Sequence, residues 1–160
     1  MYIKNNFVEN DLFIELSNYL FALSTPWYRK TSTTDIGKKD ISWFSHHFYG
    51  EGIPKSDAYQ LMGPILQKLG CRAPIQIRAN LVLKTKEHKV TNWHADYKYN
   101  DSFTSILYIN KCNGATVFKS DGVKVISESN KILTFNAPKE HATLTQTDEE
   151  ERIVVNFNYF

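Results

Sequence analysis

Residues 75–83 read Ile-Gln-Ile-Arg-Ala-Asn-Leu-Val-Leu, and this run decides the fold class of the chain. An apolar side chain stands at every second position, beginning with Ile75 and ending with Leu83. Successive side chains of a β-strand point to opposite faces, so this alternation predicts a strand with one buried face.

More runs of strand length follow this segment, and turn-forming pairs separate them. The runs cover residues 104–109, 115–118, 123–126, 131–135 and 152–160, and one aromatic-rich run, 40–49, precedes them. The turn pairs are Asn113-Gly114, Asp121-Gly122, Ser129-Asn130 and Ala137-Pro138. Many short strands joined by regular turns indicate a β-sandwich or barrel.

Helical periodicity is confined to the N-terminal part of the chain. Apolar residues recur at helical spacing over residues 10–23, where Asn10 is predicted to cap the first turn. A second helix is predicted over residues 56–69, with an interruption or restart at Pro64 and an end at Gly70. We therefore expect a mainly β, α+β fold with N-terminal helices packed on one side.

Composition narrows the class of protein. The chain has 160 residues, which predicts one domain over 1–160, and a net charge of +2, which is too small to indicate nucleic-acid binding. Its two cysteines, Cys71 and Cys112, are too few for a disulfide scaffold and are expected to be reduced. No run approaches 18 apolar residues, and the first residues lack the apolar region of a signal peptide, so we expect no membrane association and a cytoplasmic location. The sequence carries no signal for an oligomeric state.

The segment Trp93-His94-Ala95-Asp96 is the first candidate for chemistry. In an extended segment the side chains of His94 and Asp96 point to the same side and can aim a nitrogen and an oxygen at one metal ion. His141 is the candidate third ligand. Two histidines and one carboxylate form the facial triad of non-haem Fe(II) oxygenases, which leaves open positions on the metal. The alternative is that these histidines are ordinary surface or core residues.

Arg152 is the second candidate, because it begins an apolar strand-like run. A buried guanidinium needs an anion, and its planar fork suits bidentate capture of a carboxylate. The alternative is that Arg152 pairs with the acidic residues at positions 148–151. The hydroxyl of Tyr108 is predicted to donate to the same captured carboxylate, although a lone tyrosine in a strand can also be a core residue.

Together these residues resemble a known family. The order His94-x-Asp96, Tyr108-Ile-Asn, Gly114-Ala-Thr-x-Phe118, His141 and Arg152-x-Val-x-Asn156 is similar to that of the 2-oxoglutarate/Fe(II) dioxygenases. It looks closest to the small prolyl-4-hydroxylase-like branch, including compact versions found in phages, for which the location would be the host cytoplasm. The resemblance covers about residues 75–160 and implies a double-stranded β-helix, a jelly-roll barrel like that of the cupins.

The resemblance also implies a reaction. His94, Asp96 and His141 would be the catalytic iron ligands, and Arg152 with Tyr108 would hold the distal carboxylate of 2-oxoglutarate. With O₂, the co-substrate would be decarboxylated to succinate and a C–H bond hydroxylated, a peptidyl proline being favoured by the resemblance alone. The chain lacks the tyrosine that many members carry before His-x-Asp, and Asn80, or else Arg78, is expected to serve instead.

Two other classes of function stay open at this stage. One is a metal- or ligand-binding β-barrel without turnover. The other is a nucleic-acid demethylase on the same fold, but the basic residues gather only in the loop 84–89, which is also suited to be a solvated loop. We therefore expect a protein, peptide or small-molecule substrate and no nucleic-acid partner.

Overall fold

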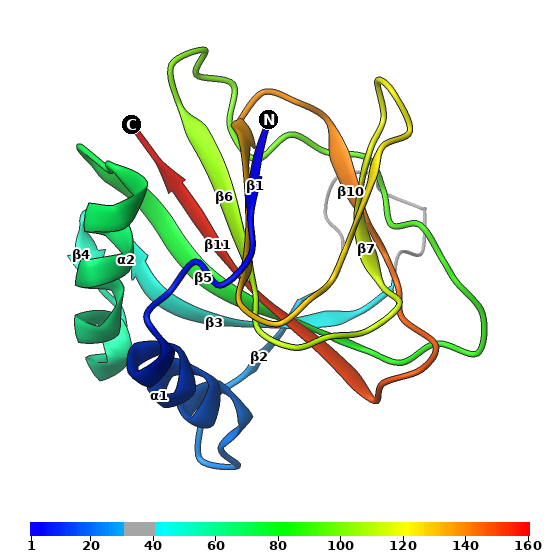
Figure 1. Ribbon diagram of the computed structural model, residues 1–160, viewed down its shortest axis with the longest axis horizontal. Helices are drawn as coiled ribbons and strands as arrows, with labels where there is room; N and C mark the ends of the chain where they lie inside the picture. The colour runs from blue at the N-terminus through cyan, green and yellow to red at the C-terminus, as the bar shows by residue number, and fades with distance from the viewer. Residues whose placement is uncertain (31–40) are drawn as a thin grey trace.

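Two antiparallel sheets make up most of the computed structural model, which describes residues 1–30 and 41–160 (Figure 1). The large sheet has the strand order β1-β9-β6-β11-β5-β3-β2, and β4 pairs with β3. Its strands are β1 (Tyr2–Lys4), β2 (Tyr28–Lys30), β3 (Trp43–Gly50), β4 (Ile53–Pro54), β5 (Pro74–Leu83), β6 (Phe103–Tyr108), β9 (Lys131–Asn136) and β11 (Glu151–Tyr159). The small sheet has the order β10-β7-β8, with β7 (Ala115–Phe118), β8 (Lys124–Ile126) and β10 (His141–Leu144).

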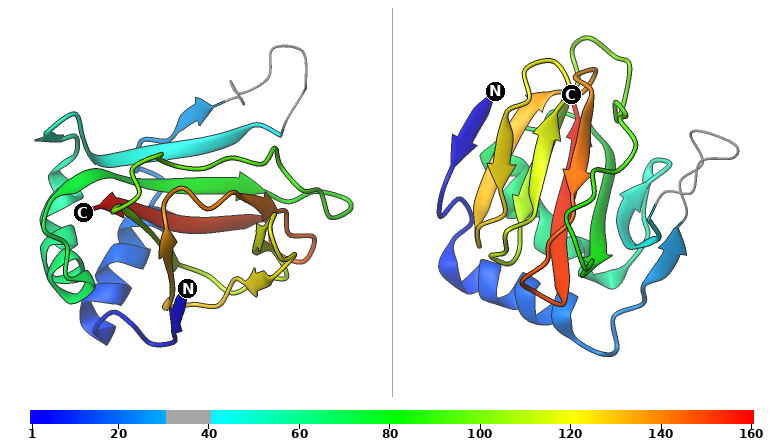
Figure 2. Two further views of the ribbon diagram at one scale, coloured as in Figure 1. Left: turned by 90° about the horizontal axis from the view of Figure 1, so that it is seen from above. Right: turned by 90° about the vertical axis from the view of Figure 1, so that its right-hand side faces the viewer.

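One face of the large sheet is covered by helices. Helix α1 (Asn10–Phe21), the 3-10 helix η1 (Asp57–Leu61) and helix α2 (Met62–Leu69) lie together against this face (Figures 1 and 2). The apolar positions of the deciding run point toward them: Ile77, Ala79 and Leu81 are buried in one core with side chains of both helices. The alternation therefore specifies the packed face, as the sequence predicts.

The opposite face of the large sheet looks toward the small sheet. A second core lies between them, formed by Ile106, Tyr108, Phe118, Val125, Leu133, Phe135 and Val154. The alternate positions of β5 and β11 also point to this side and include Arg78, Asn80, Arg152 and Asn156, which line a cavity. These polar residues therefore face a cavity between the sheets rather than the helices.

The predicted elements agree with the structure in kind, with differences at their ends. The predicted helix 10–23 ends at Phe21, and its N-cap is Glu9, without a side-chain capping bond, so the predicted cap at Asn10 is wrong. The second helix does restart: η1 gives way to α2 at Met62, which places Pro64 in the first turn, where backbone N–H groups have no helical acceptor. Gly70 ends α2 in the left-handed conformation, as predicted.

Four short strands were not predicted: β1, β2, β4 and β10. The predicted strand 40–49 begins at Trp43 among the described residues, and Asp40 lies outside them. Cys71 and Cys112 are both free thiols. None of the helices in the described ranges is long and apolar enough to cross a membrane.

Candidate metal centre and its cavity

Backbone pairing brings His94 and His141 together. His141 is the first residue of β10, and His94 lies in the segment that runs beside β10. The His94 N–H donates to the His141 carbonyl at 3.0 Å, and the His141 N–H donates to the His94 carbonyl at 2.9 Å. This pair of hydrogen bonds fixes the two residues opposite each other, and the centroids of their imidazole rings are 4.5 Å apart.

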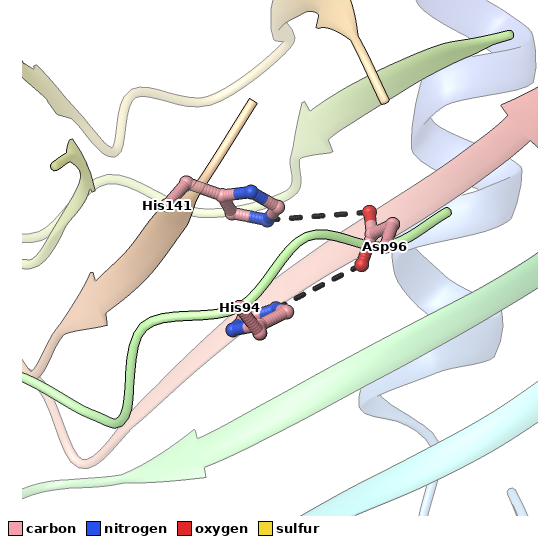
Figure 3. Close-up of side chains that lie close together, drawn as sticks. All are labelled: His94, Asp96 and His141. Carbon is pink, nitrogen blue, oxygen red and sulfur yellow. Dashed lines mark ion pairs between the residues drawn. The ribbon is translucent and has the colours of Figure 1, made fainter. Parts of the chain in front are cut away.

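Asp96 completes a cluster of three ligand-type side chains (Figure 3). Its Oδ1 lies 3.7 Å from His94 Nε2, and its Oδ2 lies 4.0 Å from His141 Nε2. One donor atom from each residue lies within 4.8 Å of the others. Two imidazole nitrogens and one carboxylate oxygen at this separation suit a single divalent metal of the Fe(II) type with open positions.

Hydrogen bonds fix which nitrogen each ring offers. The Nδ1 atom of His94 lies 3.2 Å from the Asn92 carbonyl, and that of His141 lies 3.1 Å from the Lys139 carbonyl. A carbonyl accepts only, so each Nδ1 carries the proton and each Nε2 is left with a free lone pair. Both rings are therefore held in the tautomer that a metal needs.

Asp96 is held as a carboxylate by neighbours that the sequence did not single out. Its Oδ2 accepts from Thr104 Oγ1 and from Asn158 Nδ2, each at 3.0 Å. Burial by itself raises the pKa of Asp96, but the charges of His141, Arg78 and His94 and the bond from Asn158 outweigh burial, and its pKa is lowered. The group is therefore ionised at neutral pH.

His141 is almost fully buried and packs against the ring of Phe135 at a centroid distance of 4.9 Å. Burial lowers the pKa of His141, and the nearby charge of Asp96 only partly opposes this. His94 is more open, with 36% of its side chain exposed. The centre thus has one buried imidazole and one that faces the opening.

A cavity of about 310 Å³ extends from this cluster to Arg152. Arg152 is 1% exposed, and among the described residues no carboxylate pairs with it. Its Nη2 donates weakly to Thr116 Oγ1 at 3.4 Å, its Nε has no partner, and burial lowers its pKa. Of the four acidic residues before it, Asp148 accepts from the Asn113 N–H and Glu150 pairs with Lys84, and no ion pair joins Arg152 to any of the four in the part of the chain that the structure describes, so the alternative in which Arg152 pairs with them is contradicted.

Two other predicted residues take different positions. Asn80 lines the cavity, and its Oδ1 is buried without a hydrogen-bond partner. Tyr108 is fully buried behind Arg152, whose guanidinium carbon lies 5.5 Å from the tyrosine ring centroid, and it does not line the cavity. Its hydroxyl donates to Thr116 Oγ1 at 2.9 Å, so a bond from Tyr108 to a bound carboxylate stays a prediction.

Three contributors to the site were given no role from the sequence. Thr104, Thr116 and Asn158 act through hydrogen bonds to Asp96 or Arg152, and of these only Thr116 stands within a quoted motif, Gly114-Ala-Thr-x-Phe118. Asn158 could have been found from its strand, because Arg152, Asn156 and Asn158 stand at alternate positions and so share one face of β11.

Comparisons with known proteins agree with this geometry. No protein-family model matches the chain, and no curated protein matches it by sequence. Solved structures do match. A Burkholderia pseudomallei oxidoreductase of the 2OG-Fe(II) oxygenase family is 15% identical over 91% of this chain and 76% of its own, with a TM-score of 0.64.

Two prolyl hydroxylases are also similar in structure. The enzyme from Trichoplax adhaerens, solved with a peptide fragment of the hypoxia inducible factor oxygen degradation domain, is 12% identical over 99% of this chain and 82% of its own, with a TM-score of 0.68. The Pseudomonas putida prolyl-4-hydroxylase is 17% identical over 99% of this chain and 90% of its own, with a TM-score of 0.61. The chain therefore has the jelly-roll fold of the 2OG-Fe(II) oxygenases, which confirms the predicted fold class.

Proposed function

We propose that this protein is an Fe(II)- and 2-oxoglutarate-dependent oxygenase that hydroxylates a C–H bond. In the overall reaction 2-oxoglutarate, O₂ and the substrate R–H give succinate, CO₂ and R–OH. One oxygen atom of O₂ enters succinate and the other enters the product, so the reaction needs no further reductant. His94, Asp96 and His141 are the proposed iron ligands.

The observation that carries this proposal is the buried guanidinium of Arg152, which lies in the same cavity as the triad, has an unpartnered Nε and has no carboxylate partner among the described residues. A buried guanidinium without an anion is costly, and a dicarboxylate that reaches from the metal would supply that anion. The planar fork of Arg152 suits the distal carboxylate of 2-oxoglutarate. Asn80, with an unpartnered Oδ1 in the cavity wall, is the proposed second contact to the co-substrate.

Residues of the chain orient the side chains that would hold the metal. The carbonyls of Asn92 and Lys139 hold the rings of His94 and His141 with Nε2 free, and Thr104 and Asn158 hold the carboxylate of Asp96. When bound, iron supplies open positions for the keto acid and O₂ and the redox chemistry that couples decarboxylation to hydroxylation. Val82, Ile106 and Val154 give the cavity apolar walls beside these polar groups.

The test measures co-substrate binding and turnover separately. In oxygen-free solution with Fe(II), wild type should bind 2-oxoglutarate, and Arg152→Ala should weaken this binding at least about tenfold, because a charge-assisted pair contributes ~1.5–3 kcal/mol. Arg152→Lys keeps the charge but loses the fork, so it should restore only part of the affinity. On admission of O₂, nuclear magnetic resonance should detect succinate formed by wild type.

Iron binding provides the matched control. Both Arg152 variants should bind iron like wild type, and His141→Ala should lose iron binding. The proposed iron ligands and the residue that binds the co-substrate carboxylate are different residues. An unchanged 2-oxoglutarate dissociation constant in Arg152→Ala would remove the co-substrate role. Metal binding without any succinate would favour the binding barrel without turnover. The prolyl hydroxylases among the structural neighbours make peptidyl proline the first substrate to test.

A further inference from the structure

Arg78 is a second guanidinium in the cavity wall, and the proposed reaction leaves it without a role. It lies on β5, its side chain is 28% exposed, and it lines the same cavity as the triad and Arg152. Its Nη2 is 4.0 Å from Asp96 Oδ1, which is beyond hydrogen-bond distance, and its buried Nε has no partner. Arg78 therefore forms only a long ion pair with Asp96 and has an unpartnered Nε beside the metal centre.

Charge balance shows that the loaded cavity would still be positive. Among the described lining residues the charged groups, with both histidines neutral, are Arg78, Arg152 and Asp96. A divalent metal and two guanidinium groups carry four positive charges, and Asp96 with a dianionic co-substrate offsets three of them. One positive charge remains, and we assign it to Arg78. The distal carboxylate of the co-substrate neutralises Arg152, and Asp96 and the rest of the co-substrate offset the metal.

The surroundings of Arg78 add no negative charge from the neighbouring strands. His47 of β3 is directly opposite Arg78 on one side, and Asn156 of β11 is opposite it on the other. Burial, and then the charges of Lys30 and Arg78, lower the pKa of His47, so Lys30 also adds positive potential here. Asn156 is buried, lines the cavity and has an unpartnered Oδ1.

We propose that Arg78 and Asn156 form a subsite for the head group of a free α-amino acid, whose carboxylate pairs with Arg78 while its ammonium donates to Asn156. The inference rests on the proposed function, since this subsite would select the substrate that is hydroxylated. A guanidinium fork matches a carboxylate, and an unpartnered amide oxygen matches an N–H donor. A residue within a peptide has neither free group, so this subsite would favour a free amino acid over the peptidyl proline that the structural neighbours suggest.

The test uses a loaded but unreactive protein. Zn(II)-loaded protein is saturated with N-oxalylglycine, a 2-oxoglutarate analogue with an NH group in place of one methylene. The free L-amino acids and their carboxamides are then titrated by saturation-transfer nuclear magnetic resonance. At least one acid should bind, and its carboxamide should bind at least about tenfold more weakly, because it lacks the charged carboxylate.

Variants assign this preference to Arg78. Arg78→Gln should remove the advantage of the acid over its amide, and Arg78→Lys should restore part of it. Lys86→Gln, which removes one exposed positive charge in the loop 84–89, should leave the preference unchanged. Thermal unfolding of each variant checks that the fold is retained.

Binding of N-oxalylglycine separates this proposal from the proposed function. Its affinity should stay within about twofold of wild type in Arg78→Gln and fall at least about tenfold in Arg152→Gln. If both variants weaken it equally, Arg78 belongs to the co-substrate site and the subsite is refuted. The subsite is also refuted if acids and amides bind alike, or if no free amino acid binds. If wild type itself binds no N-oxalylglycine, the proposed function is what fails.

Discussion

Gly114 lies against Arg152 so closely that no side chain fits there. A Cβ at this position would be 2.9 Å from Arg152 Cδ, 3.1 Å from the Leu144 carbonyl oxygen and 3.2 Å from Gln146 Cβ. We expect Gly114→Ala to displace Arg152, weaken 2-oxoglutarate binding severalfold and cost ~1–3 kcal/mol of unfolding free energy, because overpacked interiors are strained. Co-substrate titration and urea unfolding measure the two effects.

Gly63→Ala is the matched control for this substitution. Gly63 lies in α2, and a Cβ there would meet nothing within 4 Å. Gly63 precedes Pro64 in the first turn, where the proline ring offsets the usual helical preference for alanine over glycine. This variant should therefore change the unfolding free energy by less than about 1 kcal/mol and leave co-substrate affinity unchanged. If Gly114→Ala behaves like Gly63→Ala, the close approach of Gly114 to Arg152 has no bearing on the site.

Thr104 and Asn158 are expected to tune metal affinity without touching the metal. Both donate to Asp96 Oδ2, and Asn158 Nδ2 also donates to Thr104 Oγ1 at 2.9 Å. Thr104→Val removes a hydroxyl with little change in shape, and loss of such a supporting bond costs about 10–100-fold in metal affinity. Competition with a metal chelator measures this. Thr134→Val, which loses a bond to Ser105 instead, should bind metal like wild type.

At the residue scale, the candidate metal ligands and the anion-binding arginine were easier to predict than the residues that hydrogen-bond to them. The pair His94-x-Asp96 is recognisable because its spacing alone puts two ligands on one side of an extended segment. Arg152 is recognisable because a charge entering an apolar strand needs a partner. Thr104 and Asn158 are ordinary strand residues until the fold sets them beside Asp96, and only tertiary structure supplies that information.

At the element scale, the helices act as a support for the sheet. Leu16 of α1 is fully buried in the core between the helices and the large sheet. Leu16→Ala should cost ~2–5 kcal/mol of unfolding free energy, as large-to-small core substitutions do, while metal affinity at low temperature stays unchanged. Calorimetry and metal titration check the two parts. Ile14→Ala on the same helix, where the side chain is 48% exposed, should have little effect on stability.

The strands that were not predicted from the sequence are short segments that are extended because they pair with a neighbouring strand. β10 (His141–Leu144) is only four residues long, so its alternation of polar and apolar residues is too short to stand out in the sequence, yet it pairs with β7 along its whole length. β1 and β2 are three-residue strands at the two ends of the large sheet, with every residue exposed. Such segments are too short for period-2 patterning to identify them, and pairing with a neighbouring strand decides their conformation. β5 and β11, which are central, carry the pattern strongly.

At the scale of the whole molecule, one face of the large sheet packs against the helices and the other face lines the cavity. The sequence predicts that the alternate apolar positions of β5 are buried, and Ile77, Ala79 and Leu81 are, whereas Leu83 at the end of the strand is 50% exposed. It does not reveal that the positions in between face a cavity rather than solvent, because a polar residue looks the same in either place. The unpartnered atoms of Arg78, Asn80, Arg152 and Asn156 reveal it in the structure, since all four residues line one cavity.

Buried histidines should make the stability of the metal-free protein depend on pH. Burial is the largest cause that lowers the pKa of His46, of His47 and of His141. His46 is the best isolated of the three. Its Nδ1 donates to the Pro26 carbonyl at 3.0 Å, and its Nε2 lies 3.2 Å from the hydroxyls of Tyr19 and Ser56. Protonation would replace the acceptor at Nε2 with a donor in this buried place.

The sign of the pH effect follows from proton linkage. In the unfolded chain these histidines titrate near ~6.5, and in the folded protein below it, so between the two values the unfolded state binds more protons. The unfolding free energy should therefore be fully present above pH ~6.5 and decrease as pH falls below that value. Urea unfolding in the presence of a chelator at about pH 7.5 and about pH 5.5 measures the decrease. His46→Gln should make this decrease smaller, because it removes the buried imidazole. Equal stability of wild type at the two pH values would show that burial of these imidazoles does not govern their protonation.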